Sequence, residues 1–214
     1  MKQIENAARS ILENAPSAGH DITHSLRVRD LCLYLAQEEG GDSQVLEAAA
    51  LLHDIGRPAE FKDPDTDHAV ISAQLAPGIL SGAGFPSRNI PAVVYAIKHH
   101  RHSSGVVPDT LEARILQDAD RLDISGAVGA AMTFAYSGAM NRSLYHSGDP
   151  LGEHRQLDGD EYALDHILSK LTHLPRTMHT VTARQMAEER SRFLNGFVEQ
   201  LAGEITCCRR QQDE

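Results

Sequence analysis

The doublet His53-Asp54 ends the apolar run "ALLHDIG" and sets an imidazole beside a carboxylate. Both side chains are typical ligands of borderline divalent cations such as Mn²⁺, Fe²⁺, Co²⁺ and Zn²⁺. Consecutive residues diverge by about 100° on a helix, so both could bind one ion only near the end of a helix, where there is room. Gly56 and Pro58 are typical of such an ending. The doublet therefore predicts a pair of metal ligands where a helix stops.

Two further ligand-type residues occupy inward positions of other expected helices. His24 shares a helical face with Val28, and Asp120 lies four residues after Leu116 on an apolar stripe. A buried carboxylate must be paired, hydrogen-bonded, protonated or bound to metal. Each residue alone also fits a structural role, as a core histidine or as an aspartate paired with a neighbouring arginine. Together with the doublet they form a mixed nitrogen and oxygen set without thiolates, which differs from a closed structural zinc site.

Two more histidines lie on expected helices in the same half of the chain. His100 is in line with Val93 and Ala96 in "NIPAVVYAIKHHRH", and His68 shares a stripe with Ile71. His68 is also close enough to the start of its helix to be a solvated first-turn residue. The run around His100 is equally compatible with an ordinary polar helix end, so the residues alone leave the role of both histidines open.

The elements that must position these residues are expected to be helices. Patterns with a period of 3.6 residues recur along the chain and strand-like alternation is absent, which predicts an all-α protein. The expected helices span 3–14, 23–39, 43–54, 67–80, 87–99, 110–124, 126–136, 161–171 and 177–204. We expect one helical domain over 1–214, with the metal site in 20–125 and C-terminal helices in 161–204.

The stretch 137–160 is the one long irregular segment expected. It exceeds the roughly 12 to 15 residues beyond which a loop without secondary structure usually has a function or is disordered, and we interpret it as a candidate active-site lid. A solvated loop is an equally good interpretation. Its side chains that could meet a phosphate are Arg142, His146, His154 and Arg155.

Composition narrows the class of protein. The chain has 214 residues, 41% of them apolar, which is enough for a globular domain with a substantial core. A formal net charge of −10 argues against a polymeric nucleic acid or an anionic membrane as partner, because both require clustered basic residues. No segment approaches the roughly 18 apolar residues of a membrane span. With only three cysteines, a cytoplasmic location is expected.

Longer motifs around these residues are similar to a known family. The stretches "GHDITHSLRV", "ALLHDIGR", "AIKHH", "LEARILQDADRLDISGAVG" and "YALDHILSKLTHLP" resemble the HD-domain metal-dependent phosphohydrolase superfamily, and within it the small bacterial YedJ/YpgQ-like branch. The similarity extends over nearly the whole chain. The order histidine, histidine-aspartate, aspartate carries it, because a lone His-Asp doublet occurs by chance.

The resemblance implies a helical HD-domain bundle with a divalent metal held by His24, His53, Asp54 and Asp120. Mn²⁺ is the ion most expected, with Mg²⁺, Co²⁺, Fe²⁺, Ni²⁺ or Zn²⁺ as alternatives. Members with two metals add histidines between the doublet and the last aspartate, and the residues here that would hold a second metal are His68 and His100. Many of those members carry a lysine shortly after the doublet, where this chain has Arg57, and their "GYP" signature is missing. Both departures weaken any transfer of cyclic-dinucleotide activity.

The implied reaction is hydrolysis of a nucleotide at a phosphate ester or phosphoanhydride, including cleavage of a triphosphate to a monophosphate and pyrophosphate. Asp54 would be both ligand and acceptor of the water's proton, and His100 would donate a proton to the leaving oxygen or hold a phosphate oxygen. Candidate phosphate contacts, each also compatible with a surface role, are Lys98, Arg101 and Lys170.

Other functions remain open on the sequence alone. Some HD-fold proteins are di-iron oxygenases, which would require His68 and His100 as ligands. A catalytically silent, metal-stabilised binding module is a third interpretation. The expected partner is a small-molecule nucleotide, and a homodimer is left open.

Overall fold

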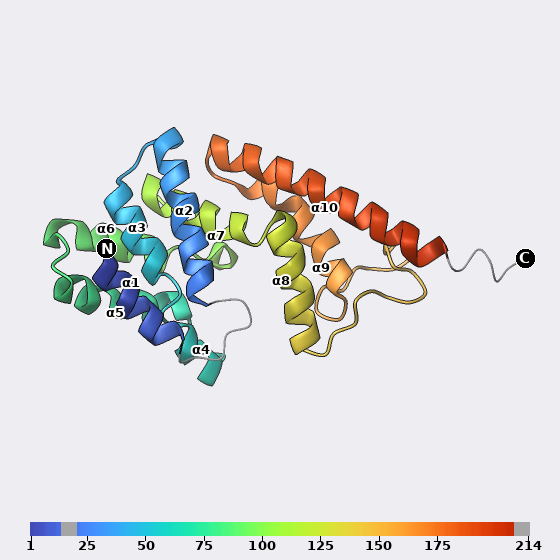
Figure 1. Ribbon diagram of the computed structural model, residues 1–214, viewed down its shortest axis with the longest axis horizontal. Helices are drawn as coiled ribbons and strands as arrows, with labels where there is room; N and C mark the ends of the chain where they lie inside the picture. The colour runs from blue at the N-terminus through green and yellow to red at the C-terminus, as the bar shows by residue number, and fades with distance from the viewer. Residues whose placement is uncertain (14–20, 208–214) are drawn as a thin grey trace, which may run out of the picture. The chain divides into compact units, whose positions relative to one another are not determined.

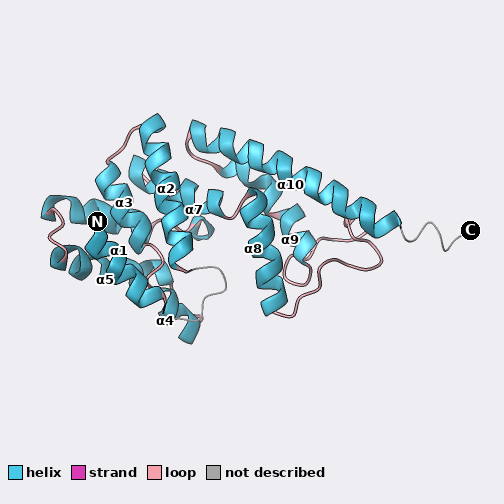
Figure 2. Ribbon diagram, viewed as in Figure 1, coloured by secondary structure: helices cyan, strands magenta, loops and turns pink. Residues whose placement is uncertain are grey.

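The computed structural model of the protein describes residues 1–13 and 21–207, and within them the regular structure is helical (Figure 1, Figure 2). Apart from helices, these residues form one isolated bridge between Ser143 and Tyr162. The all-α prediction is confirmed. The α-helices are α1 (Lys2–Leu12), α2 (Ile22–Glu39), α3 (Ser43–Leu52), α4 (Arg57–Lys62), α5 (His68–Gly82), α6 (Ile90–Lys98), α7 (Leu111–Asp123), α8 (Gly126–Ala139), α9 (Ala163–Ser169) and α10 (Val181–Cys207). Short 3₁₀ helices are η1 (Ser87–Asn89), η2 (His102–Ser104) and η3 (Leu171–Thr177).

The described residues form two compact units. The first contains residues 1–123 and 179–183, and the second contains the remainder. Helix α10 begins in the first unit and continues in the second. All candidate metal ligands belong to the first unit, so the fold of that unit decides their geometry.

Helix α3 is the centre of the first unit. It packs against α2, α6 and α7, and every residue from Ala48 to Leu52 is fully buried. Burial of a leucine side chain contributes roughly 1.5 to 3 kcal/mol, so Leu51 and Leu52 hold the end of α3 firmly in the core. The His53-Asp54 doublet follows Leu52 directly and therefore lies in the interior.

Aspartate caps fix where three helices of this unit begin. The Asp21 carboxylate accepts hydrogen bonds from the backbone N–H groups of Thr23 and His24 at the start of α2. Asp42 caps α3 in the same way, and Asp67 caps α5 through the single N–H of Ala69. Such a cap contributes about 1 kcal/mol and sets the rotation of the first turn. The caps of α2 and α5 thereby fix the directions in which His24 and His68 leave the backbone.

Gly56 has a different role from the one its sequence context suggests. We expected Gly56 and Pro58 to end the preceding helix, but α3 already stops at Leu52, and Gly56 has ordinary right-handed angles of φ −83° and ψ −11° as the N-cap of α4. A Cβ at Gly56 would lie 2.3 Å from the His68 carbonyl oxygen. The Gly56 N–H also donates to Ser72 Oγ at 2.8 Å. Glycine is required here because α5 approaches the backbone closely, which brings His68 beside Asp54.

Several expected boundaries are wrong by a few residues. Helix α8 continues to Ala139 instead of stopping at 136, and α10 starts at Val181 instead of 177. The helix expected over 161–171 is α9 followed by η3, because the backbone of Lys170 leaves the helical region at φ −120°. The irregular segment of the second unit is therefore shorter at its start than expected.

The segment between α8 and α9 is tied together by its own side chains. Both terminal nitrogens of Arg155 donate to the buried Asp165 carboxylate, and Arg142 donates to the Gly159 carbonyl. The Asp149 carboxylate accepts from the backbone N–H groups of residues 153 and 154. The ring of His146 also accepts from the Asp149 N–H, so three of the four side chains considered for phosphate binding have protein partners. The function of this segment as a lid stays a prediction.

The second unit has its own apolar core. Residues of α8, α9, η3 and α10 bury one cluster, which consists of Ala130, Leu164, Ile167, Leu171, Leu194 and Val198. Among the described residues, none of the helices is both long enough and apolar enough to cross a membrane.

Candidate metal centre

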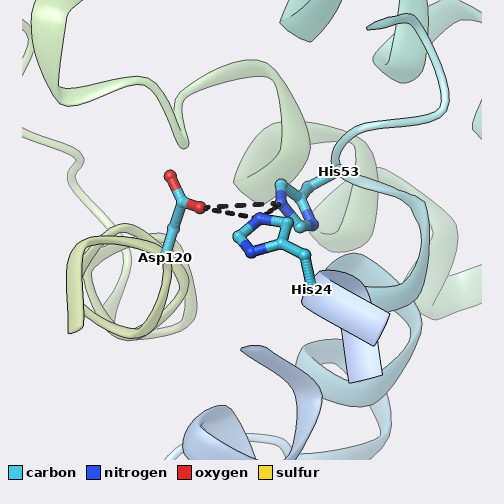
Figure 3. Close-up of side chains that lie close together, drawn as sticks. All are labelled: His24, His53 and Asp120. Carbon is cyan, nitrogen blue, oxygen red and sulfur yellow. Dashed lines mark hydrogen bonds and ion pairs between the residues drawn. The ribbon is translucent and has the colours of Figure 1, made fainter. Parts of the chain in front are cut away.

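The side chains that the sequence singled out meet at one point inside the first unit. His24 comes from α2, His53 follows α3, and Asp120 comes from α7; Figure 3 shows the three pointing toward one another. His24 Nε2 lies 3.2 Å from His53 Nε2 and 3.3 Å from Asp120 Oδ1, and His53 Nε2 lies 3.7 Å from the same oxygen. Asp54 Oδ2 is 3.6 Å from each of the two Nε2 atoms. Three separate elements therefore converge through nitrogen and oxygen donors.

These separations fit a metal ion. Donor atoms bound tetrahedrally at about 2.0 to 2.2 Å from an ion are roughly 3.3 to 3.6 Å apart, which is close to the spacing found here. Two imidazoles with two carboxylates suit Mn²⁺, Fe²⁺, Co²⁺ or Zn²⁺. The side chains of His24 and His53 are 0% exposed and that of Asp54 is 1% exposed, whereas that of Asp120 is 25% exposed. Of the four side chains, that of Asp120 is thus the one partly accessible to solvent.

The second ring nitrogen of each histidine explains why both Nε2 atoms are available. His53 Nδ1 donates to the Ala50 carbonyl at 2.7 Å, and His24 Nδ1 donates to Asp123 Oδ2 at 2.7 Å. A carbonyl or carboxylate oxygen only accepts, so the proton of the neutral ring must be on Nδ1. In its neutral form each ring therefore directs an Nε2 lone pair at the centre, as a metal ligand requires.

A second cluster of histidines lies on the other side of Asp54. His68 Nε2 is 3.3 Å from Asp54 Oδ1 and 3.2 Å from His100 Nε2, while His100 Nε2 is 3.8 Å from Asp54 Oδ1. His68 Nδ1 contacts Glu60 Oε1 at 3.0 Å, and His100 Nδ1 donates to the Ile97 carbonyl at 2.7 Å. The two oxygens of Asp54 therefore face two different histidine pairs.

Arg57 adjoins this second cluster. Its Nε donates to Asp54 Oδ1 at 3.0 Å, and its Nη1 donates to Glu60 Oε2 at 2.8 Å. The oxygen that faces His68 and His100 is thus already in contact with a guanidinium cation. A positive charge at this distance opposes a second cation near Asp54 Oδ1 and partly neutralises the carboxylate.

The electrostatics of the site show that positive charge is needed between its carboxylates. Burial lowers the pKa of His53 to about 4, so its ring is neutral. Burial acts against protonation of His24 as well, but hydrogen bonds with Asp120 and Asp123 outweigh it and raise the pKa of His24 to about 10. Burial alone would raise the pKa of Asp120, yet its hydrogen bond with His24 holds that pKa well below its usual range. The proton on His24 supplies positive charge between the carboxylates.

Metal binding is therefore expected to release about one proton per ion at pH 7.5, because a ligating His24 must give up the proton on Nε2. His53 contributes none, since its pKa of about 4 leaves it neutral at that pH. The apparent affinity should fall as the pH is lowered, because protons then compete more strongly for His24. Calorimetric titration with Mn²⁺ in buffers of different ionisation enthalpy measures the number of protons. Binding without any proton release at pH 7.5 would contradict this picture of His24.

The basic residues considered as phosphate contacts lie in different places. Lys98 is exposed at the end of α6, and Lys170 is exposed in the second unit, directly after α9. Arg101 Nη1 lies 3.1 Å from Asp67 and 3.5 Å from Glu60, which in turn contacts His68. Of the three, Arg101 is the one that the structure links to the histidine clusters.

Two residues that the sequence reasoning missed support the ligands. Glu60 contacts both His68 and Arg57, and Asp123 contacts the ring of His24. A signal for Asp123 was present, because it follows Asp120 by three residues in "DADRLD" and so shares its helix face. For Glu60 no local pattern would have shown the contact, since α5 brings His68 to it.

Comparisons with known proteins place these residues in a wider context. Residues 21–125 match the model of the HD domain family. Over 209 residues the chain is 36% identical to the protein YpgQ of Bacillus subtilis strain 168, covering 95% of this chain and 93% of YpgQ. A crystal structure of YpgQ in complex with ADP superposes with a TM-score of 0.71 at 32% identity, over 95% of this chain and 93% of that one.

Two other relatives carry names of enzymes. An HD-superfamily hydrolase from Bacillus thuringiensis superposes with a TM-score of 0.74 at 32% identity, and the match covers 95% of both chains. Ribonuclease Y of Thermoanaerobacter pseudethanolicus is 34% identical over 101 residues, which is 47% of this chain but 18% of that enzyme. The similarity to the ribonuclease is therefore local, whereas the similarity to YpgQ and to the hydrolase extends over nearly the whole chain.

Proposed function

Because the chain belongs to the HD-domain family, we propose that it is a metal-dependent phosphohydrolase acting on a nucleotide. The observation that carries the proposal is the convergence of His24, His53, Asp54 and Asp120, whose donor atoms lie 3.2 to 3.7 Å apart in the pairs given above. Nucleotide chemistry is supported by ADP in the crystal structure of YpgQ, to which this chain is similar over most of its length.

The metal ion would be coordinated by Nε2 of His24 and His53, Oδ2 of Asp54 and Oδ1 of Asp120. A divalent ion held there supplies a water of lowered pKa and neutralises charge on the phosphoryl oxygens. Asp54, which would ligate the ion through Oδ2, would also accept the proton of the attacking water, while its Oδ1 points away from the four-donor centre toward His68 and Arg57. Its contact with Arg57 stabilises the carboxylate form, which keeps Asp54 an acceptor between turnovers.

His100 fits the role of acceptor better than that of proton donor. Its Nδ1 proton is committed to the Ile97 carbonyl, so Nε2 carries a lone pair. Burial lowers the pKa of His100 further and opposes the imidazolium form that could protonate a leaving oxygen. We therefore propose that His100 Nε2 acts as a neutral hydrogen-bond acceptor or, together with His68, as a ligand of a second cation. Arg101 is the candidate for contact with the phosphate chain, and Lys98 and Lys170 are weaker candidates because they are exposed.

The arrangement of His68 and His100 also supports a second candidate function. A di-iron oxygenase would need both histidines as ligands, and the two oxygens of Asp54 do face separate histidine pairs. Arg57 argues against it, because its guanidinium lies 3.0 Å from the Asp54 oxygen that faces His68 and His100, and its positive charge opposes a second cation there. We favour the hydrolase, since hydrolysis needs only the four-donor centre.

The substrate class is tested by a product panel. Mn²⁺-loaded protein is incubated with nucleoside mono-, di- and triphosphates and with an RNA oligonucleotide, and the products are identified by phosphorus NMR. We expect phosphate or pyrophosphate to be released from a free nucleotide. The net charge of −10 disfavours an extended RNA, so the oligonucleotide should remain intact. Cleavage of the oligonucleotide alone would contradict the proposed substrate class and favour an activity like that named for ribonuclease Y.

A further inference from the structure

We propose that Asp123, held in place by Arg27, is a positioning residue that orients His24 for metal binding. The inference rests on the proposed metal centre and assigns a function to a residue pair outside it. Asp123 is on α7 and His24 on α2, 99 positions apart in the chain, and their contact of 2.7 Å is buried.

One turn of α7 holds both nitrogens of the His24 ring. Asp120 Oδ1 lies 3.3 Å from Nε2, and three residues later Asp123 Oδ2 lies 2.7 Å from Nδ1. The spacing of three residues places the two carboxylates on one helix face. Asp120 is therefore positioned to share a metal with His24, while Asp123 holds the opposite side of the same ring. Together they fix the ring's rotation as well as the nitrogen that carries the proton.

Arg27 holds the Asp123 carboxylate at both oxygens. Its Nε donates to Oδ1 at 2.7 Å and its Nη2 donates to Oδ2 at 2.8 Å, while its Nη1 reaches Thr23 Oγ1 at 3.3 Å. Bidentate pairing of this kind restricts rotation of a carboxylate and keeps it ionised. Since the side chain of Asp123 is only 3% exposed, Arg27 also supplies the counter-charge that a buried carboxylate requires.

His24 differs from the other ligating histidine in the kind of acceptor that orients it. His53 donates its Nδ1 proton to a main-chain carbonyl, whereas His24 donates to a carboxylate. A charged acceptor increases the electron density of the ring and so the strength of its bond to a metal. The contribution of His24 should therefore depend on one replaceable side chain, and that dependence can be measured.

The test compares Mn²⁺ affinities of the full-length protein and its variants by calorimetry. Asp123→Asn keeps the size of the side chain, but its NH₂ group must replace one of the two oxygens. In place of Oδ1 it loses the contact with Arg27 Nε, and in place of Oδ2 it loses the contacts with both Arg27 Nη2 and His24 Nδ1. We expect Asp123→Asn to weaken Mn²⁺ binding about 10- to 100-fold, the usual effect of losing such a partner. Arg27→Gln leaves Asp123 in place, so it should weaken Mn²⁺ binding less than Asp123→Asn does. Relative to the wild type, the loss should still exceed about threefold.

The matched control is Asp165→Asn in the second unit. Asp165 is also buried and also paired with an arginine through two contacts, but its partner is Arg155 and it touches none of the candidate ligands. Both asparagine variants should lower the thermal midpoint measured in excess chelator, whereas only Asp123→Asn should weaken Mn²⁺ binding. This difference separates positioning of His24 from a general loss of stability.

Wild-type affinity in Asp123→Asn, or an equal loss in Asp165→Asn, would overturn the inference and leave the proposed function standing. Should Asp123→Asn fail to fold, Arg27→Gln decides, and unchanged affinity in that variant would likewise overturn it. If the wild-type protein itself binds no Mn²⁺, the proposed metal centre is wrong, and the inference is wrong with it.

Discussion

We expect the Asp54→Asn substitution to lower the rate of hydrolysis by about a thousandfold or more. Removing a group that stabilises charge in a transition state has an effect of this size. Asp54 Oδ2 lies 3.6 Å from the Nε2 atoms of both His24 and His53, and Oδ1 lies 3.3 Å from His68 Nε2. Asparagine has nearly the same shape but one oxygen and no charge. It therefore removes a ligand, the proposed proton acceptor and the contact between the two histidine pairs in a single step.

The measurement is the initial rate of phosphate or pyrophosphate release at saturating Mn²⁺, together with the metal content after gel filtration. Asp30→Asn serves as control, because Asp30 is an exposed residue of α2 that pairs with its neighbour Arg29 at 2.8 Å. The control should keep the wild-type rate. An Asp54→Asn variant that retains both metal and a rate near that of the wild type would show that the reaction occurs elsewhere.

The directions of the candidate ligands could be predicted because helical periodicity is a local property. Apolar neighbours at spacings of three and four residues place His24 and Asp120 on inward faces, and the structure brings both to the centre with His53. The family resemblance then indicated that these residues bind one metal ion together. Periodicity states that a side chain points into the core, but it does not state what the side chain meets there.

Contacts between distant segments account for what could not be predicted. The close approach of α5 to Gly56 is set by packing, so the sequence around Gly56 suggested a helix end instead. In the same way Asp123 meets His24 across 99 positions of the chain. The early end of α9 at Lys170 shows a third limit, because the apolar pattern continues through the break into η3.

Removal and replacement of the metal is the other large expected effect. Chelation should abolish hydrolysis, because the buried donors of His24, His53, Asp54 and Asp120 would then hold only a proton, which cannot activate water for attack on phosphorus. Reloading with Mn²⁺ should restore it. A redox-inert ion is sufficient for hydrolysis, whereas oxygen activation needs iron that changes its valence. Restored activity should therefore not require oxygen.

The rate of nucleotide hydrolysis by Mn²⁺-reloaded protein under anaerobic conditions, with the metal content determined on the same sample, tests the central claim most directly. We expect phosphate or pyrophosphate to be released at the aerobic rate, with one ion per chain sufficient for activity. If iron alone restores turnover, with two ions bound per chain and oxygen consumed, the protein is an oxygenase with His68 and His100 as ligands, and the phosphohydrolase proposal is wrong.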